Sequence, residues 1–292
     1  MQKLIIEAAI NEQAPKSDNP TIPYTVEECI REAIAAADAG AAIVHFHARD
    51  SDTGDMQEPG TEFYLEAMRE IRRQRPSLLI YPTYGFASDA VERYSHVKAL
   101  ADDPGVRLNM ATIDPGAVNM GSLDPGGNQE LSDMLFNVPH SHVRYVMGMA
   151  REYDFPFSFV IREPGHIRHA ITYYRMGLVD APLFFKICLN EDVPWGMPPS
   201  PRAIDAYLSV IPPDVPYIWM NYTYGSNALQ MNLHAIATGG HVRTGLGDNP
   251  VEPDGSIITN AAHVARIVDI ARQAGRETAT PEEAVAIMRG RA

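Results

Sequence analysis

Short runs of apolar residues recur along this chain, and longer stretches with the apolar spacing of helices lie between them. Several of the runs are nearly uninterrupted, which is typical of parallel strands that are covered by helices. We therefore predict eight strands. They occupy residues 4–10, 41–47, 78–83, 107–112, 157–161, 183–188, 217–222 and 242–246.

Helices are predicted between most of these strands. The first begins at Thr25, which forms a capping box with Glu28, and it ends at Gly40, because glycine favours the backbone conformation that closes a helix. A last helix begins near Thr280, where a proline follows in the first turn. The other predicted helices lie at 62–74, 88–101, 140–153, 166–177, 201–210, 226–238 and 260–274.

Strands that alternate with helices in this way predict an α/β fold, a TIM (β/α)8 barrel. The length of 292 residues suits one such domain over 1–292, with an extra C-terminal helix near 280–290. A doubly wound open sheet is the alternative, but no phosphate-binding glycine motif follows the first strand. The stretch 113–139 is rich in glycine and proline, and we expect it to be a long loop at the catalytic end of the barrel.

Composition narrows the functional classes. With 24 basic and 37 acidic residues, the net charge of −13 argues against a nucleic-acid or anionic-membrane partner. We also expect no membrane span and no secretory signal, because no apolar stretch is long enough for either. Only two cysteines occur, Cys29 and Cys188, and neither has metal or redox spacing. A disulfide scaffold is excluded, and a cytoplasmic location is expected.

The strongest local pattern is AAIVHFHARD at 41–50. His45 and His47 are two residues apart at the end of a predicted strand, so both side chains point to the same face. Two imidazoles at the mouth of a barrel can bind a divalent metal, with zinc the first candidate. The alternative is a pair of core histidines whose nitrogens are hydrogen-bonded within the protein.

A second pattern, TGGHVRTGLGDN, covers residues 238–249. Arg243 lies in the last predicted strand, and Asp248 and Asn249 follow in the next loop. An arginine beside a carboxylate at a barrel mouth can bind an anion and keep the carboxylate ionised. A barrel-lining ion pair without a catalytic role is the alternative reading.

Further polar residues end or follow the predicted strands. Thr83 and Thr112 stand where barrel residues often contact substrate, although either could simply stabilise a turn. Glu12 follows the first strand and could face the mouth, and Glu163 follows the fifth.

The chain resembles the β-keto acid cleavage enzymes, a family that includes 3-keto-5-aminohexanoate cleavage enzymes. The resemblance rests on NPTIPYT at 19–25, DAGAAIVHFHARD at 38–50, NMAT at 109–112, GGHVRTGLGDN at 239–249 and the segment 260–284. These pieces run through almost the whole chain in order, and the two histidine-containing pieces together are specific.

The resemblance implies a TIM barrel, a bound Zn²⁺ or other divalent metal, and acetyl-CoA as cosubstrate. A β-keto acid and acetyl-CoA would become acetoacetate and a new acyl-CoA, and the protein would be a homo-oligomer, often a tetramer. His45 and His47 match the metal histidines. Thr83 matches a serine that holds the substrate carboxylate. The matches at Thr112, Arg243 and Asp248 imply catalytic residues, and Glu12 and Asn249 are expected to contact substrate.

One position departs from the family pattern. Gly247 stands where the family has a glutamate that is the third protein ligand of the zinc. Two imidazoles bind zinc less tightly than two imidazoles and a carboxylate, so another group must complete the site or the affinity falls. Glu7, Glu12 and Glu163 are the nearby candidates. The shorter loop after the first strand makes an aminated substrate less expected.

These observations leave three hypotheses. The first is a metal-dependent enzyme that exchanges CoA between acetyl-CoA and a β-keto acid, with Asp248 as the base. The second is a metal-dependent aldolase or hydrolase acting on a keto acid. The third is a non-catalytic small-molecule-binding homologue that has lost its metal carboxylate at Gly247.

Overall fold

A computed structural model describes residues 1–123 and 129–291, with side chains described outside 122, 123 and 129–132. Eight parallel strands form one sheet in the order β3-β2-β1-β10-β9-β8-β7-β4. The two outer strands of this order, β3 and β4, contact each other and nearly close the ring. The predicted TIM barrel is therefore confirmed. The strands are β1 (Ile6–Ala9), β2 (Ile43–Phe46), β3 (Leu79–Pro82), β4 (Ala111–Ile113), β7 (Phe157–Ile161), β8 (Leu183–Leu189), β9 (Tyr217–Thr223) and β10 (His241–Thr244).

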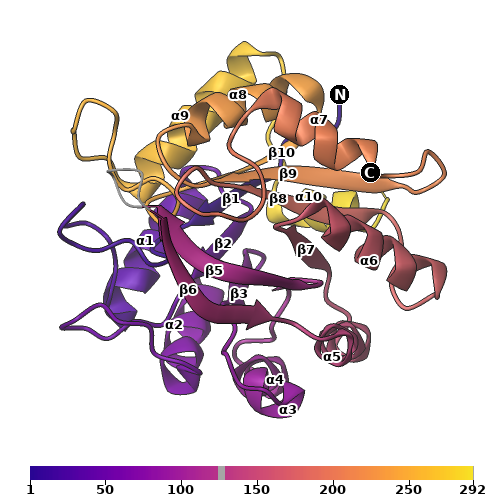
Figure 1. Cartoon of the computed structure of the whole chain (residues 1–292). Coiled ribbons are helices and arrows are strands. Elements are labelled where there is room, and N and C mark those ends of the chain that lie inside the picture. The colour runs from indigo at the N-terminus through magenta and orange to yellow at the C-terminus, as the bar shows by residue number, and fades with distance from the viewer. Residues whose placement is uncertain (124–128, 292) are drawn as a thin grey trace.

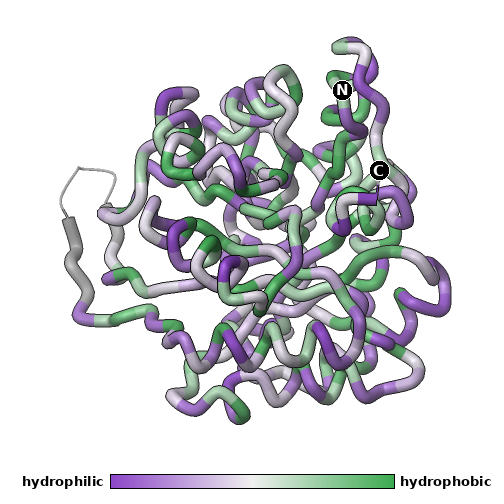
Figure 2. Tube along the Cα trace, turned by 90° about the vertical axis from the view of Figure 1, so that its right-hand side faces the viewer, coloured by the Kyte–Doolittle hydropathy of each residue, from purple (hydrophilic) through white to green (hydrophobic). Residues whose placement is uncertain are grey.

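The helices alternate hydrophilic and hydrophobic residues along the chain (Figure 2), so that each can turn one apolar face to the barrel. The predicted capping box is confirmed, since Thr25 accepts from the Glu28 amide and Glu28 accepts from the Thr25 amide. No helix in the described part of the chain is long and apolar enough to span a membrane. The helices are α1 (Val26–Asp38), α2 (Thr61–Gln74), α3 (Ala90–Arg93), α4 (Ser95–Asp102), α5 (His140–Glu152), α6 (Pro164–Arg175), α7 (Pro201–Ser209), α8 (Ala228–Thr238), α9 (Asn260–Gln273) and α10 (Pro281–Met288).

The single helix predicted at 88–101 is wrong, because α3 and α4 are separated at Tyr94. Its backbone leaves the helical region, with φ −108° and ψ 19°, and its side chain is fully buried. The ring packs between those of Tyr84 and Tyr145. Burial of this aromatic ring, which periodicity does not reveal, accompanies the break.

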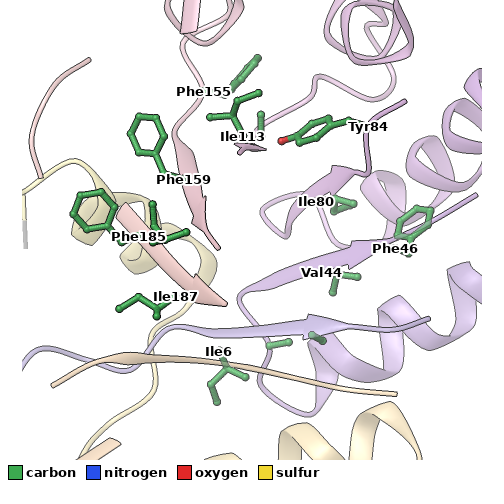
Figure 3. Packing of buried hydrophobic residues seen from close by; sticks show 14 of the residues in the cluster. Ile6, Val44, Phe46, Ile80, Tyr84, Ile113, Phe155, Phe159, Phe185 and Ile187 are labelled. Carbon is green, nitrogen blue, oxygen red and sulfur yellow. The ribbon is translucent and has the colours of Figure 1, made fainter. Parts of the chain in front are cut away.

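The main core lies between the strands and the surrounding helices. Apolar residues of successive strands, including Ile6, Val44, Ile80 and Phe159, are arranged around the barrel and are buried (Figure 3). Such an outer layer explains why the strands read as almost continuous apolar runs.

A second core fills one end of the barrel interior. Ile5, Leu79 and Phe184 pack there with Ala284 and Ile287 of α10. The C-terminal helix thus closes the end from which the strands start, and the end where the strands finish is left for polar groups. TIM barrels place their sites at that end.

The long loop expected at 113–139 is wrong in its secondary structure. Residues 117–123 and 129–137 form an antiparallel hairpin, β5 (Ala117–Leu123) and β6 (Gln129–Asn137), which crosses in front of the barrel strands in Figure 1. Val118 of the hairpin packs with Val160 and Tyr222 at the barrel mouth. Glycine and proline hide these strands in the sequence, because contact with the barrel rather than local propensity stabilises them.

Candidate metal centre at the barrel mouth

The loops after β1 and β2 are joined by one asparagine side chain. Asn11 donates through Nδ2 to the His47 carbonyl at 2.9 Å and accepts through Oδ1 from the His47 amide at 2.9 Å. These two bonds continue the β1–β2 pairing beyond the last strand residues. They fix the two neighbouring segments that carry Glu12 and His45.

Glu12, His45 and His47 form a compact group of possible metal ligands. The carboxylate oxygens of Glu12 lie 3.1 Å from Nε2 of His45 and 3.0 Å from Nε2 of His47. The two Nε2 atoms are 3.1 Å apart. All three side chains are buried. The two histidines therefore share one face, as the spacing predicts, and the chain supplies a carboxylate between them.

The surroundings leave the facing nitrogens available. Nδ1 of His45 donates to the Tyr81 carbonyl at 3.1 Å, so its Nε2 carries the free lone pair that a metal needs. Burial lowers the pKa of His45, which keeps the imidazole neutral. Burial also raises the pKa of Glu12, but Arg243 and the two imidazoles outweigh it and hold that pKa well below its ordinary value. Two imidazoles and one carboxylate are a donor set that fits zinc.

Glu12 reaches this place through an unusual backbone. Its φ is +39°, in the left-handed region that few side chains adopt. The Arg49 side chain binds the carbonyls of Glu12 and Ala14 at 3.2 and 2.6 Å, which holds the loop in that shape. Gly247 leaves the space, because a Cβ there would lie 2.5 Å from Cγ of Glu12. The departure at Gly247 and the inward position of Glu12 are thus one steric feature.

Arg243 connects the centre to the last strand. It donates to both oxygens of Asp248 at 3.0 and 3.2 Å through Nε, to Glu7 at 3.2 Å and, through a second terminal nitrogen, to Glu12. The guanidinium also lies over the Tyr222 ring, 3.8 Å from its centroid. Each of its three nitrogens donates to a carboxylate, so Arg243 orients Glu7, Glu12 and Asp248.

Asp248 lies on the loop after β10 and lines the same mouth as the histidines. Burial raises the pKa of Asp248 to about 7, and the Arg243 guanidinium acts in the opposite direction. The sequence predicts that Arg243 favours the ionised form of this carboxylate, and burial acts against that effect. A pKa near neutrality suits a group that must accept and return a proton.

A charged floor lies beneath the centre. Lys186 of β8 forms an ion pair with Glu7 of β1 at 2.5 Å and donates to the Tyr81 hydroxyl at 2.7 Å. Tyr81 in turn stacks on His45, with ring centroids 4.4 Å apart. Burial lowers the pKa of Lys186 to about 8. Sequence reasoning missed Lys186, although a lone lysine in the apolar run LFFKICL is a signal of a buried partner.

The mouth encloses a cavity of about 470 Å³, within the range of small-molecule sites. Thr83 and Thr112 both line it, as do the metal-ligand candidates. The Thr112 hydroxyl donates to the Ser158 carbonyl at 3.2 Å and accepts from the Ser158 hydroxyl at 2.9 Å. Thr112 is thus held against β7 by Ser158.

Three residues singled out from the sequence lie elsewhere. Asn249 is not among the residues that line the mouth cavity, and its carbonyl accepts from His263 at 3.0 Å. Glu163 accepts from the Gly196 amide at 2.8 Å, and Glu7 belongs to the floor with Lys186. Of the three carboxylates proposed to replace the missing ligand, Glu12 is the one that meets both histidines in the described structure.

The chain matches the family model described as beta-keto acid cleavage enzyme over residues 3–289. It is 32% identical to a 3-keto-5-aminohexanoate cleavage enzyme of Fusobacterium nucleatum, across 99% of this chain and 98% of that one. It is 26% identical to a 3-oxoadipate:acetyl-CoA acetyltransferase of Cupriavidus necator, across 98% and 95%. Among solved structures, it is similar to ObcA with oxaloacetate, with a TM-score of 0.70 at 17% identity over 93% of this chain and 67% of that one. This last likeness concerns the fold.

Proposed function

Because the chain belongs to the beta-keto acid cleavage enzyme family, we propose that it exchanges CoA between acetyl-CoA and a β-keto acid, which yields acetoacetate and a new acyl-CoA. The relatives act, by their names, on keto acids, and several use acetyl-CoA. The observation that supports the proposal most is the Glu12–His45–His47 group in the same cavity as Asp248.

Glu12, His45 and His47 would hold a divalent metal, with zinc favoured by the two nitrogens and one oxygen. When bound, such an ion polarises a keto oxygen and stabilises the negative charge that develops as a carbon–carbon bond breaks. The carboxylate therefore comes from the loop after β1, whereas the family pattern takes it from the loop after β10. Glu12 thereby changes from an expected substrate contact to a proposed ligand.

Asp248 is the proposed base. It removes a proton from C2 of the β-keto acid, and this carbon attacks the thioester carbonyl of acetyl-CoA, so that the CoA thiolate leaves. The thiolate then attacks C3 of the adduct, and the C2–C3 bond breaks. Acetoacetate takes back the proton at C2, and the remaining acyl group leaves as its CoA ester. Atoms and charge balance without an oxidant or reductant.

Arg243 holds Asp248 in place through three hydrogen bonds. Its cation also stabilises the ionised form that the first step needs. Thr83 lies at the cavity wall and is proposed to hold the carboxylate of the keto acid, and Thr112 is proposed to orient the reacting carbons. Asn249 is buried and lines a separate small pocket together with Asn232 and His263. It would therefore support the Asp248 loop instead of touching substrate.

The test combines metal analysis of the purified protein with an assay for acetoacetate, using acetyl-CoA and a panel of β-keto acids. We expect one zinc per chain and acetoacetate formed only when acetyl-CoA is present. Product without the CoA ester would favour an aldolase or hydrolase. The absence of both bound metal and turnover would favour a small-molecule-binding homologue. His47→Ala should abolish both metal binding and turnover, and unchanged metal occupancy would remove that ligand.

A further inference from the structure

One cation in the mouth cavity has no role in the chemistry above. Arg162 follows β7, whereas the metal-ligand candidates lie in the loop after β1 and at the end of β2, so Arg162 lies on another part of the rim of the same cavity. Between β7 and β2 stand β4 and β3 on one side and four strands on the other. A ligand bound at both places must cross the mouth.

The Arg162 guanidinium is held in position but is only partly hydrogen-bonded. Nε donates to Asp114 at 2.7 Å, and this aspartate is buried. The plane lies near two aromatic rings, 5.0 Å from the Trp195 centroid and 5.2 Å from the Phe136 centroid. Among the described atoms, which leave out the side chains of 122, 123 and 129–132, no hydrogen-bond acceptor for its two terminal nitrogens occurs. These nitrogens form a fork that matches a carboxylate.

The other arginine of the cavity lining already forms ion pairs with carboxylates at both of its terminal nitrogens. Arg243 is shared among Glu7, Glu12 and Asp248. Trp195 adds a further donor, since its indole nitrogen is buried and has no acceptor in the described part of the chain. It is 8% exposed and lines the same cavity. Arg162 after β7 and Trp195 in the loop after β8 are thus neighbours, and both offer donors without an acceptor among the described atoms.

From this arrangement we infer that Arg162 binds a second carboxylate, at the far end of the acyl chain, and that the preferred substrates are 3-oxo dicarboxylates. This inference rests on the proposed function, in which the keto acid's own carboxylate lies near Thr83. The aromatic walls of Phe136 and Trp195 pack against the methylene groups between the two ends. A cationic acyl chain is disfavoured, because it would meet the guanidinium.

The experiment compares 3-oxo dicarboxylates of increasing length, each with the 3-oxo monocarboxylate of equal carbon number. For 3-oxoadipate the partner is 3-oxohexanoate. We expect the dicarboxylate to have the higher kcat/KM in at least one pair. Arg162→Met should lower that value by about 10- to 100-fold and leave the monocarboxylate unchanged, as expected for loss of a hydrogen-bonded charge pair. Arg162→Lys should restore part of the preference, and Arg168→Met, an exposed arginine of α6, is the matched control.

Three outcomes would overturn the inference. An equal loss of kcat/KM for both substrates, together with a lower melting temperature, would mean that Arg162 only holds the Phe136 and Trp195 rings in position. A raised KM for acetyl-CoA alone would mean that the fork binds the cosubstrate. Preference for the monocarboxylate in every pair would exclude an acidic acyl chain.

A direct binding measurement separates this inference from the proposed function. Isothermal titration of the zinc-loaded protein with each dicarboxylate and its monocarboxylate partner needs no turnover. If no acetoacetate forms with any keto acid, the proposed function fails, while tighter dicarboxylate binding that depends on Arg162 still supports the anion subsite. Equal binding of both members in every pair overturns the subsite.

Discussion

At the scale of single residues, the candidate metal centre depends on a pair of positions 235 apart in the chain. Glu12 has a left-handed backbone and reaches both imidazoles, and Gly247 leaves room for its side chain. Neither feature is informative alone, since a loop glutamate and a loop glycine are both common. Together they support the proposal that the carboxylate ligand comes from the loop after β1 instead of the loop after β10.

Glu12→Gln tests this carboxylate as a ligand. The amide keeps the size of the side chain but removes the charge, so zinc affinity should fall by more than the ~10- to 100-fold typical of losing a residue that only orients a ligand. A competition titration with a chelating dye measures the affinity. Glu163→Gln, which changes a carboxylate bonded to the Gly196 amide, should leave it unaltered. Unchanged affinity in the Glu12 variant would contradict the assignment.

Gly247→Ala tests the steric half of the pair. The new methyl would overlap Cβ and Cγ of Glu12, so we expect lower zinc affinity and a destabilisation of ~1–3 kcal/mol. Combining it with Glu12→Gly removes the overlapping atoms, and the alanine should then cost much less. Denaturant unfolding of the metal-free single and double variants gives this coupling. Additive effects would show that the two positions act independently.

At the scale of elements, capping places the first helix and packing places the hairpin. Thr25 and Glu28 satisfy the first amides of α1 through local contacts, which is why its start is readable from sequence. The hairpin β5–β6 has no comparable local signal. It is placed by Val118 against the barrel and by Arg93, which donates to the Asn137 carbonyl at 2.6 Å.

Thr25→Ala should destabilise the protein by ~1 kcal/mol, because the Glu28 amide loses its acceptor at the helix start. We expect the melting temperature to fall by ~2–4 °C, and differential scanning calorimetry measures it. Thr25→Ser keeps the hydroxyl and is the matched control. An alanine variant that melts with the wild type would show that tertiary contacts alone hold this end of α1.

At the scale of the whole molecule, closure of the barrel makes the protein sensitive to acid. His241, at the start of β10, accepts through Nδ1 from the amide of Ile5, the residue before β1, at 3.0 Å. Its Nε2 is buried with no partner in the part of the chain that the structure describes. Burial, with the nearby Arg276 cation, lowers the pKa of His241 to about 3. The histidine of the GGHVR motif is therefore structural and remains neutral.

The sign of the pH dependence follows from that value. Between about 3 and the ordinary pKa of 6.5, the unfolded chain binds a proton at His241 and the folded chain does not. The contribution to stability is therefore complete above pH 6.5 and is lost progressively as the pH falls, with a limit of about 5 kcal/mol. His241→Gln keeps an acceptor without titrating, so the metal-free variant should lose less stability on acidification. Urea unfolding of both proteins from pH 7 to 4 measures this, and parallel pH curves would contradict it.

The order of strands and helices, the capped start of α1 and the convergence of His45 and His47 are determined by sequence alone. Each depends on local periodicity or on neighbours within four residues, and such patterns can be read directly from the amino-acid sequence. The third metal-ligand candidate, the split of the helix at Tyr94, the hairpin, and the unmatched fork of Arg162 were decided by tertiary structure. They depend on contacts between distant segments, as when Gly247 leaves space for Glu12, and no local pattern encodes such a fit.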